Sequence, residues 1–342
     1  MLCALIMAGG RGTRFWPIST EEKPKQFLNL VEERTMLQLT VDRCLNIMNI
    51  ENVFICTSEK YVAIVKEQLP HLPVQNIIVE PVGRNTAPCV LLSTLYIKQL
   101  FENANIVVLP SDHEINNLTR YLNILQEADT YLTKTNDGII TLGIKPTYPE
   151  TGYGYIKYEQ SDAFIKLVDR FVEKPDIDTA MTYIDEGCYL WNAGMFMFHV
   201  DYMISIAKEY MSETYQKLNN LPTIFDKDYY EQLTHTYPTC ESISFDYAVA
   251  EKCKNMMVIE SDIDWDDVGS WKALERYLKE DQDGNISRGK QCFINSNNNI
   301  TYTNKKIIVQ DVDDILCVES DEYIIITKKE NIERIHTLKE NV

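Results

Sequence analysis

Glycines and cations alternate in the first loop of the chain, directly after a short apolar run. The run Leu2–Ala8 has strand length, and it is followed by three glycines and four cations: Gly9, Gly10, Gly12, Arg11, Arg14, Lys23 and Lys25. Glycine leaves backbone N–H groups open to approach because it has no Cβ. Such groups beside Arg and Lys suit a polyphosphate. The alternative is a plain glycine-rich turn, but a turn alone needs no such cations.

Two common phosphate-binding motifs do not match this loop. A Rossmann fingerprint starting at Gly10 needs a third glycine where this chain has Phe15. A P-loop needs Gly-Lys-Ser or Gly-Lys-Thr after a four-residue spacer, and the loop lacks that sequence. The loop therefore predicts phosphate binding without either standard motif.

The whole stretch from Leu5 to Leu28, LIMAGGRGTRFWPISTEEKPKQFL, resembles the signature of sugar-1-phosphate nucleotidylyltransferases. Its FWP and KPKQFL parts look most like mannose-1-phosphate guanylyltransferases, also called GDP-mannose pyrophosphorylases. The resemblance implies Mg²⁺-dependent transfer of GMP from GTP to mannose 1-phosphate by in-line attack, with release of pyrophosphate. It also implies that Arg14 holds the β- and γ-phosphates and that Lys25 stabilises charge near the α-phosphate. The nucleotide-binding residues implied for this loop are Ala8, Gly9, Gly10, Gly12, Thr13, Arg14 and Lys25.

Composition limits the classes of partner. The 342 residues carry a formal net charge of −18, and hydrophobic residues make up 45% of the chain, as in a globular protein. An acidic chain of this kind is not expected to bind nucleic acid or an anionic membrane, both of which need a basic surface. A local pocket of Arg and Lys remains compatible with this charge.

The nine cysteines form no CxxC pair, which favours buried free thiols and a reducing compartment. The N-terminus runs into a strand without a basic leader, and no apolar run reaches the roughly 18 residues of a membrane span. We therefore expect a cytoplasmic protein. No residue pattern specifies the oligomeric state. We expect a homo-oligomer, namely a dimer.

Short apolar runs alternate with helical patterns through the first third of the chain. Strands are expected at Val53–Cys56, Ile77–Val79 and Ile106–Leu109, with helices at Met36–Met48, Tyr61–Leu69 and Pro88–Leu100. This alternation predicts an α/β fold with a Rossmann-like, mixed but mostly parallel sheet flanked by helices. Ligands of such sheets bind beyond the carboxyl ends of the strands, so the loops after the strands are candidate sites.

The loop after Ile77–Val79 reads EPVGRNTAP, from Glu80 to Pro88. Asn85 before Thr86 and a proline can be a simple helix cap. In the family that the chain resembles, this loop faces the purine. The resemblance then makes Glu80, Gly83, Arg84 and Asn85 contacts to the base or ribose, and a carboxylate suits the donor edge of guanine.

Two aspartates are candidate Mg²⁺ ligands. Asp112 follows the strand Ile106–Leu109, where an Asp beside a phosphate loop suits Mg²⁺, although it could also cap the next helix. His113 is interpreted as a packing or supporting residue. The run DIDWDDVGSW carries four carboxylates that could form a solvated acidic face. By resemblance, the carboxylate before Val-Gly, Asp267, is the second metal ligand.

Sugar contacts are implied by resemblance in the middle of the chain. The TGYGYIKY strand contributes Gly152, Tyr153 and Gly154, and Phe164–Val172 ends in Glu173 and Lys174. The family match makes Glu173 an acceptor for sugar hydroxyls and Lys174 a contact to the sugar phosphate, whereas a solvated turn is the alternative. Asn192 and Gly194 interrupt an apolar strand, which indicates a bulge or a close ligand approach. The segment Tyr202–Leu233 is expected to be helical core.

After a polar loop at 281–285, short apolar runs recur about every eight residues. They predict an all-β segment, such as a short β-helix. The expected domains are thus a nucleotidylyltransferase domain at 1–280 and a β-rich domain at 285–342. Longer bifunctional relatives continue into a phosphomannose isomerase domain, so that second activity is not expected here.

Two other function classes remain open. One is a related enzyme, a heptose-phosphate guanylyltransferase or a glucose-1-phosphate uridylyltransferase. The other is a non-catalytic subunit that senses sugar nucleotides, which should have lost Arg14, Lys25 or a metal-binding aspartate. All of these residues are present in this sequence, which favours an enzyme. The absence of a Ser-His-Asp or Cys-His constellation agrees with a reaction in which the sugar phosphate is itself the nucleophile.

Overall fold

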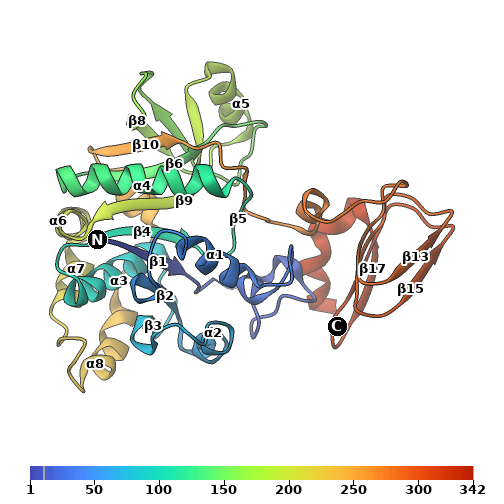
Figure 1. Ribbon diagram of the computed structural model, residues 1–342, viewed down its shortest axis with the longest axis horizontal. Coiled ribbons are helices and arrows are strands. Elements are labelled where there is room, and N and C mark those ends of the chain that lie inside the picture. The colour runs from blue at the N-terminus through green and yellow to red at the C-terminus, as the bar shows by residue number, and fades with distance from the viewer. Residues whose placement is uncertain (11, 342) are drawn as a thin grey trace. The chain divides into compact units, whose positions relative to one another are not determined.

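Nine of the apolar segments pair into one mixed sheet (Figure 1). In sheet order they are β3 (Ile77–Glu80), β2 (Val53–Ser58), β1 (Leu2–Met7), β4 (Asn105–Pro110), β9 (Tyr189–His199), β6 (Ile139–Ile144), β10 (Met256–Glu260), β8 (Lys166–Val172) and β7 (Tyr155–Tyr158). The strands β3, β2, β1 and β4 are parallel, and β10 is parallel to β6. β9 runs antiparallel to both β4 and β6. The expected mixed sheet with helices is therefore present.

The structure is a computed structural model, and it describes residues 1–10 and 12–341. Arg11 of the first loop therefore lies outside the described residues. The chain forms two compact units. The first unit comprises Met1–Gly9, Val41–Ser111 and Ile115–Trp265, and the second comprises Gly10–Thr40, Asp112–Glu114 and Asp266–Val342. The sequence predicts a different division, into two consecutive domains with a boundary near residue 280. That boundary stays a prediction.

The central strands of the first unit are apolar at successive positions because both of their faces are covered. Cys3 and Leu5 of β1 belong to the core that includes α3 (Thr86–Leu100), while Ala4 and Ile6 point the opposite way and are equally buried. α3 packs on α6 (Val200–Tyr210) and α7 (Ser212–Asn219). α4 (Leu118–Thr135) packs on β4 and β9 (Figure 1).

The remaining helices are α1 (Met36–Cys44), α2 (Val62–Gln68), α5 (Ile177–Glu186) and α8 (Tyr229–Thr236). The segment expected to be helical at Tyr202–Leu233 is divided in the structure into α6, α7 and α8. Pro222 lies in the break between α7 and α8, and proline disfavours a helical conformation in the residue before it. No helix in the described part of the chain is long and apolar enough to cross a bilayer.

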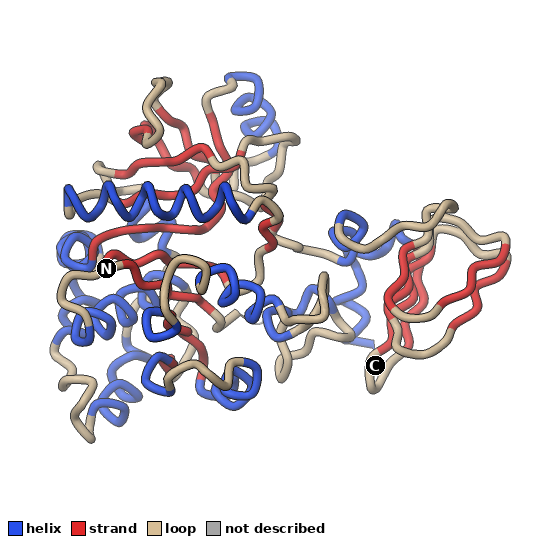
Figure 2. Tube along the Cα trace, in the orientation of Figure 1, coloured by secondary structure: helices blue, strands red, loops and turns tan. Residues whose placement is uncertain are grey.

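The C-terminal strands belong to the second unit, where Figure 2 colours them red. β12 (Ile286–Arg288), β14 (Ile300–Tyr302) and β16 (Ile315–Glu319) pair in parallel, and β17 (Ile324–Lys328) joins β16 in antiparallel. β13 (Gln291–Ile294) and β15 (Ile307–Gln310) form a second parallel pair. Two buried asparagines link successive turns of the chain: Asn299 donates to Asn285 at 2.9 Å, and its own oxygen accepts from the backbone of Ile315 at 3.1 Å.

The N-terminal loop of the second unit is held by aromatic packing. Phe15 and Trp16 are buried with Trp271 and with apolar side chains of the C-terminal strands. The rings of Phe15 and Trp271 lie 5.2 Å apart, and the Trp271 indole N–H donates to the Trp16 carbonyl at 3.2 Å. The FWP part of the sequence is therefore a core element that fixes the glycine-rich loop beside it.

Candidate active site

The glycine-rich loop folds back on the segment that carries Lys25. Gly12 has a φ of +44°, and a Cβ there would lie 2.7 Å from the Lys25 backbone nitrogen. Only glycine therefore fits the loop at this point. Gln26, in the short helix η2 (Lys25–Phe27), donates its side-chain amide to the Gly10 carbonyl at 3.0 Å. This packing holds Lys25 against the glycine-rich loop.

Lys25 connects the two aspartates that the sequence singled out. Its ammonium nitrogen lies 2.9 Å from the Asp112 carbonyl, 3.0 Å from the Asp112 carboxylate and 2.5 Å from the Asp267 carbonyl. An ammonium has three donors, so each one has an acceptor here. The Lys25 side chain is only 7% exposed, so its ammonium is shielded from solvent where three chain segments meet. We refer to Lys25, Asp112 and Asp267 as the lysine junction.

A cavity of about 360 Å³ opens at the lysine junction, within the size range of small-molecule sites. Its lining residues are Gly12, Arg14, Lys25, Asp112, His113, Asp267 and Gly269. Arg14 is exposed, so its guanidinium is available at the cavity. The sequence expected Arg14, Lys25, Asp112 and Asp267 to act together, and the structure brings all four to one cavity.

The oxygen atoms at this cavity fit a hard divalent cation. Burial alone would raise the pKa of Asp112, but the nearby Lys25 and His113 charges and the hydrogen bonds to its carboxylate hold that pKa below its usual value. Asp112 is therefore an anion at neutral pH, with its side chain 32% exposed. Mg²⁺ prefers such carboxylate oxygens. Asp112 does not cap a helix, because Asn117 caps α4.

The acidic run around Asp267 divides into exposed and structural members. Asp262 and Asp264 are exposed, as expected of a solvated face. Asp266 instead accepts from the Val268 backbone at 2.7 Å and pairs with Arg276. A Cβ at Gly269 would lie 2.9 Å from the Asp267 carboxylate, so glycine leaves room for that side chain. The structural role of Asp266 had no signal in the sequence beyond its charge.

The loop at 80–88 supports α3 in the first unit. The Asn85 side chain accepts from the Thr86 backbone at 2.9 Å, and its φ is +66°, so the capping alternative is observed. The Arg84 guanidinium donates to the Pro238 carbonyl. A Cβ at Gly83 would meet no atom within 4 Å. Contacts of this loop to a purine stay a prediction.

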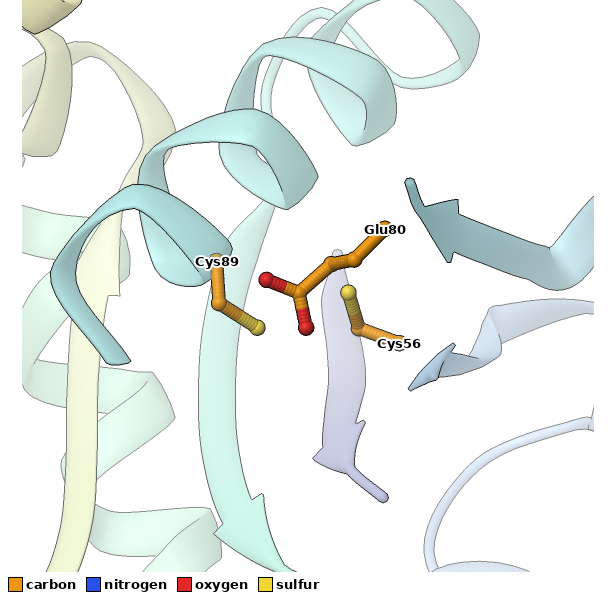
Figure 3. Close-up of side chains that lie close together, drawn as sticks. All are labelled: Cys56, Glu80 and Cys89. Carbon is orange, nitrogen blue, oxygen red and sulfur yellow. The ribbon is translucent and has the colours of Figure 1, made fainter. Parts of the chain in front are cut away.

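Glu80 points into the protein rather than outward from the end of β3. The residue is only 6% exposed, and its carboxylate accepts from the Tyr237 hydroxyl. Figure 3 shows it between the thiols of Cys56 and Cys89, and the three ligand atoms lie within 4.8 Å of one another. A Cβ at Gly9 would lie 3.1 Å from the second carboxylate oxygen, so the glycine-rich loop begins directly over Glu80.

Burial raises the pKa of Glu80 from 4.5 to about 7, against the opposing hydrogen bonds from Tyr237 and Cys89. The folded chain therefore keeps a proton that the unfolded chain loses between these two pH values. The resulting stabilisation is fully present below about pH 4.5 and is lost as the pH rises to 7, by at most about 3 kcal/mol. We expect Glu80→Gln to remove this loss and to be more stable than the wild type at pH 8.

Urea unfolding at pH 5 and pH 8 checks the expectation for Glu80→Gln. The gain over the wild type should be clearly larger at pH 8 than at pH 5. Glu241→Gln, at an exposed position, should show no such difference. An equal effect of Glu80→Gln at both pH values would show that the buried carboxyl does not titrate in this range.

The sugar residues expected from the sequence come together within the first unit. A Cβ at Gly154 would lie 2.7 Å from the Glu173 carboxylate, so the position just before β7 favours glycine. Lys174 has a φ of +47°, and its ammonium lies 2.9 Å from Glu173. Tyr153 stacks edge-on between Trp191 and Trp265, with ring centroids 5.4 and 5.3 Å away. Gly152 donates its backbone N–H to Glu150 at 2.7 Å.

The interruption of the strand at Asn192 is a β-bulge, one of the two interpretations of the sequence. Pairing of β6 with β9 shifts between Thr141 and Gly143, and Gly194 has a φ of +67°. The Asn192 amide donates to the Asp246 carboxylate at 3.0 Å. Sequence reasoning gave Asp246 no role, although it lies in the segment Ser242–Ala250 that matches the family. The cysteines are free thiols, and six of the nine are buried.

Comparisons with known proteins identify the family of the chain. Residues 3–284 match the family described as "Nucleotidyl transferase". A mannose-1-phosphate guanylyltransferase of Escherichia coli is 33% identical, covering 100% of this chain and 75% of its own length. A mannose-1-phosphate guanylyltransferase of Salmonella muenchen is 36% identical, covering 98% of this chain and 72% of its own length. A solved structure from Thermus thermophilus, described as "mannose-1-phosphate geranyltransferase", superposes with a TM-score of 0.87 at 29% identity over 99% and 98% of the chains. This chain belongs to the nucleotidyl transferase family.

Proposed function

We propose that this chain is a mannose-1-phosphate guanylyltransferase, which transfers GMP from GTP to α-D-mannose 1-phosphate and releases pyrophosphate. The observation that carries the proposal is the lysine junction, where Lys25 and two aspartates meet at a cavity that Arg14 also lines. Relatives that carry this enzyme name match essentially the whole chain. The substrates are thus GTP and mannose 1-phosphate.

The reaction brings two polyanions together, so its barrier comes mainly from charge repulsion and alignment. Arg14, exposed at the cavity, would bind the β- and γ-phosphates. Asp112 and Asp267 would hold Mg²⁺, which when bound neutralises phosphate charge. Lys25 keeps both aspartates in place and adds positive charge near the α-phosphate. No general base is needed, because a phosphate monoester is already an anion at neutral pH.

The proposed roles in the first unit concern the sugar and the base. Lys174, which is 58% exposed beside Glu173, would orient the sugar phosphate. Glu173, Asn192 and the backbone at Gly154 and Gly194 would surround the sugar ring. Glu80, Gly83, Arg84 and Asn85 form the proposed base loop, with Glu80 acting from beneath the loop through its buried carboxyl.

The proposed function also includes a Rossmann-like sheet and a short C-terminal β-helix. The parallel strands β1–β4 support a Rossmann-like arrangement, and the stacked parallel ladders with their buried asparagines support a short C-terminal β-helix. We also propose a cytoplasmic protein that forms a homodimer.

A panel of nucleotides and sugar phosphates in a pyrophosphate-release assay tests the proposed substrates. GTP with mannose 1-phosphate should be the best pair, and ATP should be slower by about two orders of magnitude, because a mismatched base leaves buried polar groups unpaired. Preference for UTP with glucose 1-phosphate, or for a heptose phosphate, would favour the related enzymes. No turnover with any pair would favour a sensing subunit.

A further inference from the structure

Asp246 is a polar residue that the roles above do not use. It begins the π-helical turn η7 (Asp246–Ala250), a conformation that occurs frequently at functional sites. The preceding residue, Phe245, is buried, and its backbone N–H donates to Thr86 at 2.7 Å. The Phe245 ring lies 4.7 Å from that of Phe196 on β9. These contacts fix the start of the turn and so fix the position of Asp246.

The Asn192 amide is committed to contacts within the protein. Its oxygen accepts from the Thr141 hydroxyl at 3.2 Å and from the Gly194 backbone at 3.1 Å. Its nitrogen donates to the Asp246 carboxylate at 3.0 Å. The amide orientation is therefore determined by three contacts on and around the bulge. Asn192 acts on its surroundings chiefly by aiming one oxygen of Asp246.

Asp246 shares its environment with Glu173 and Lys174. Burial, and next the negative charge of Glu173, raise the pKa of Asp246 to about 6, while Lys174 opposes the shift. Two carboxylates close together in a poorly solvated place cost free energy unless donors satisfy them. Yet Asp246 is not fully buried, and its carboxylate has lone pairs beyond the one that Asn192 contacts. Such an arrangement suits a ligand that brings several O–H donors.

We propose that Asp246 is a sugar-binding residue, whose carboxylate accepts hydrogen bonds from ring hydroxyls beside Glu173, and that Asn192 is the residue that positions it. The inference rests on the proposed function and extends its sugar site. Ionised carboxylates are purely acceptors, and hydroxyls on neighbouring ring carbons are donors at matching spacing. The Lys174 ammonium beside them would receive the phosphate of the same sugar.

Kinetics of Asp246→Asn tests the inference. Asn keeps the oxygen that accepts from Asn192 but loses the charge, so the fold should persist. The KM for mannose 1-phosphate should rise about 10- to 100-fold, the range expected for lost hydrogen bonds to a charged group. The KM for GTP should stay within about twofold, and the exposed control Glu241→Gln should match the wild type. Asn192→Ala should raise the same KM, and the double variant should be non-additive.

Monodeoxy analogues of mannose 1-phosphate add a readout that needs no variant to fold. In the wild type, at least one analogue should bind clearly more weakly than the parent sugar, and in Asp246→Asn that difference should shrink. Equal binding of all analogues by the wild type, or an unchanged KM in Asp246→Asn, would overturn the inference while leaving the proposed function intact. A wild type without GTP and mannose 1-phosphate activity would overturn both.

Discussion

Lys25→Ala is expected to lower turnover by about two orders of magnitude or more, the scale seen when a preorganised electrostatic group is removed. The physical reason is specific to the lysine junction. One ammonium satisfies the Asp112 carboxylate and two backbone carbonyls, and it is almost fully buried. Its removal leaves these acceptors unpaired, so the melting temperature should fall as well.

Arg14→Ala is the matched comparison for Lys25→Ala. Arg14 lines the same cavity but is exposed, so turnover should fall by a similar factor of about 100 while the melting temperature stays unchanged. Steady-state kinetics together with thermal unfolding separates the two cases. Activity within a few-fold of the wild type in both variants would remove this cavity from the reaction.

Asp112→Asn and Asp267→Asn are each expected to abolish Mg²⁺-dependent turnover, because asparagine keeps the volume but loses the charge that a divalent cation requires. Asp267 touches Lys25 only through its backbone carbonyl, so Asp267→Asn should fold normally. Asp112→Asn also weakens the ion pair with Lys25 and should therefore be somewhat less stable. The double variant should be no less active than either single variant, since one lost ligand already disables the site.

The structure indicates which nearby aspartate is a suitable control for the Asp112→Asn and Asp267→Asn variants. Asp264 is exposed, and its φ of +51° suits asparagine, so Asp264→Asn should keep wild-type activity. Asp266 is unsuitable because it pairs with Arg276 and caps the turn at Val268. Turnover measured across Mg²⁺ concentrations checks the set. An Asp267→Asn enzyme with ordinary Mg²⁺ dependence would exclude Asp267 as a ligand.

Several features of the cavity could be predicted from the sequence, for identifiable reasons. The glycines and cations of the first loop indicate phosphate binding by their types alone, and Asp112 follows an apolar strand where ligands are expected. The meeting of Lys25 with Asp112 and Asp267 could not be predicted from spacing. Two of its three bonds go to backbone carbonyls, which no residue pattern encodes.

The direction in which a side chain points was the second feature that could not be predicted from the sequence. By resemblance Glu80 was expected to contact the base or ribose, and that role stays a prediction. The sequence could not show that its carboxylate turns inward to Tyr237, a residue 157 positions away. Asp246 lies in a segment that resembles the family, but the sequence could not show its contact with Asn192 at the bulge or its closeness to Glu173. Residues 202–233 were expected to be helical, and most of them lie in α6, α7 and α8. Of the two breaks between these helices, only the one that contains Pro222 has a helix-breaking residue in the sequence.

The most direct measurement uses mannose 1-phosphate labelled with ¹⁸O in its three non-bridging phosphate oxygens, incubated with GTP, Mg²⁺ and the enzyme. Attack of a sugar phosphate oxygen on the α-phosphorus forms the new P–O–P bond and expels the β- and γ-phosphates as pyrophosphate. Mass spectrometry should find all of the label in GDP-mannose, one atom of it in the bridging position by ³¹P NMR, and none in pyrophosphate. Label in pyrophosphate, or no GDP-mannose at all, would contradict the account.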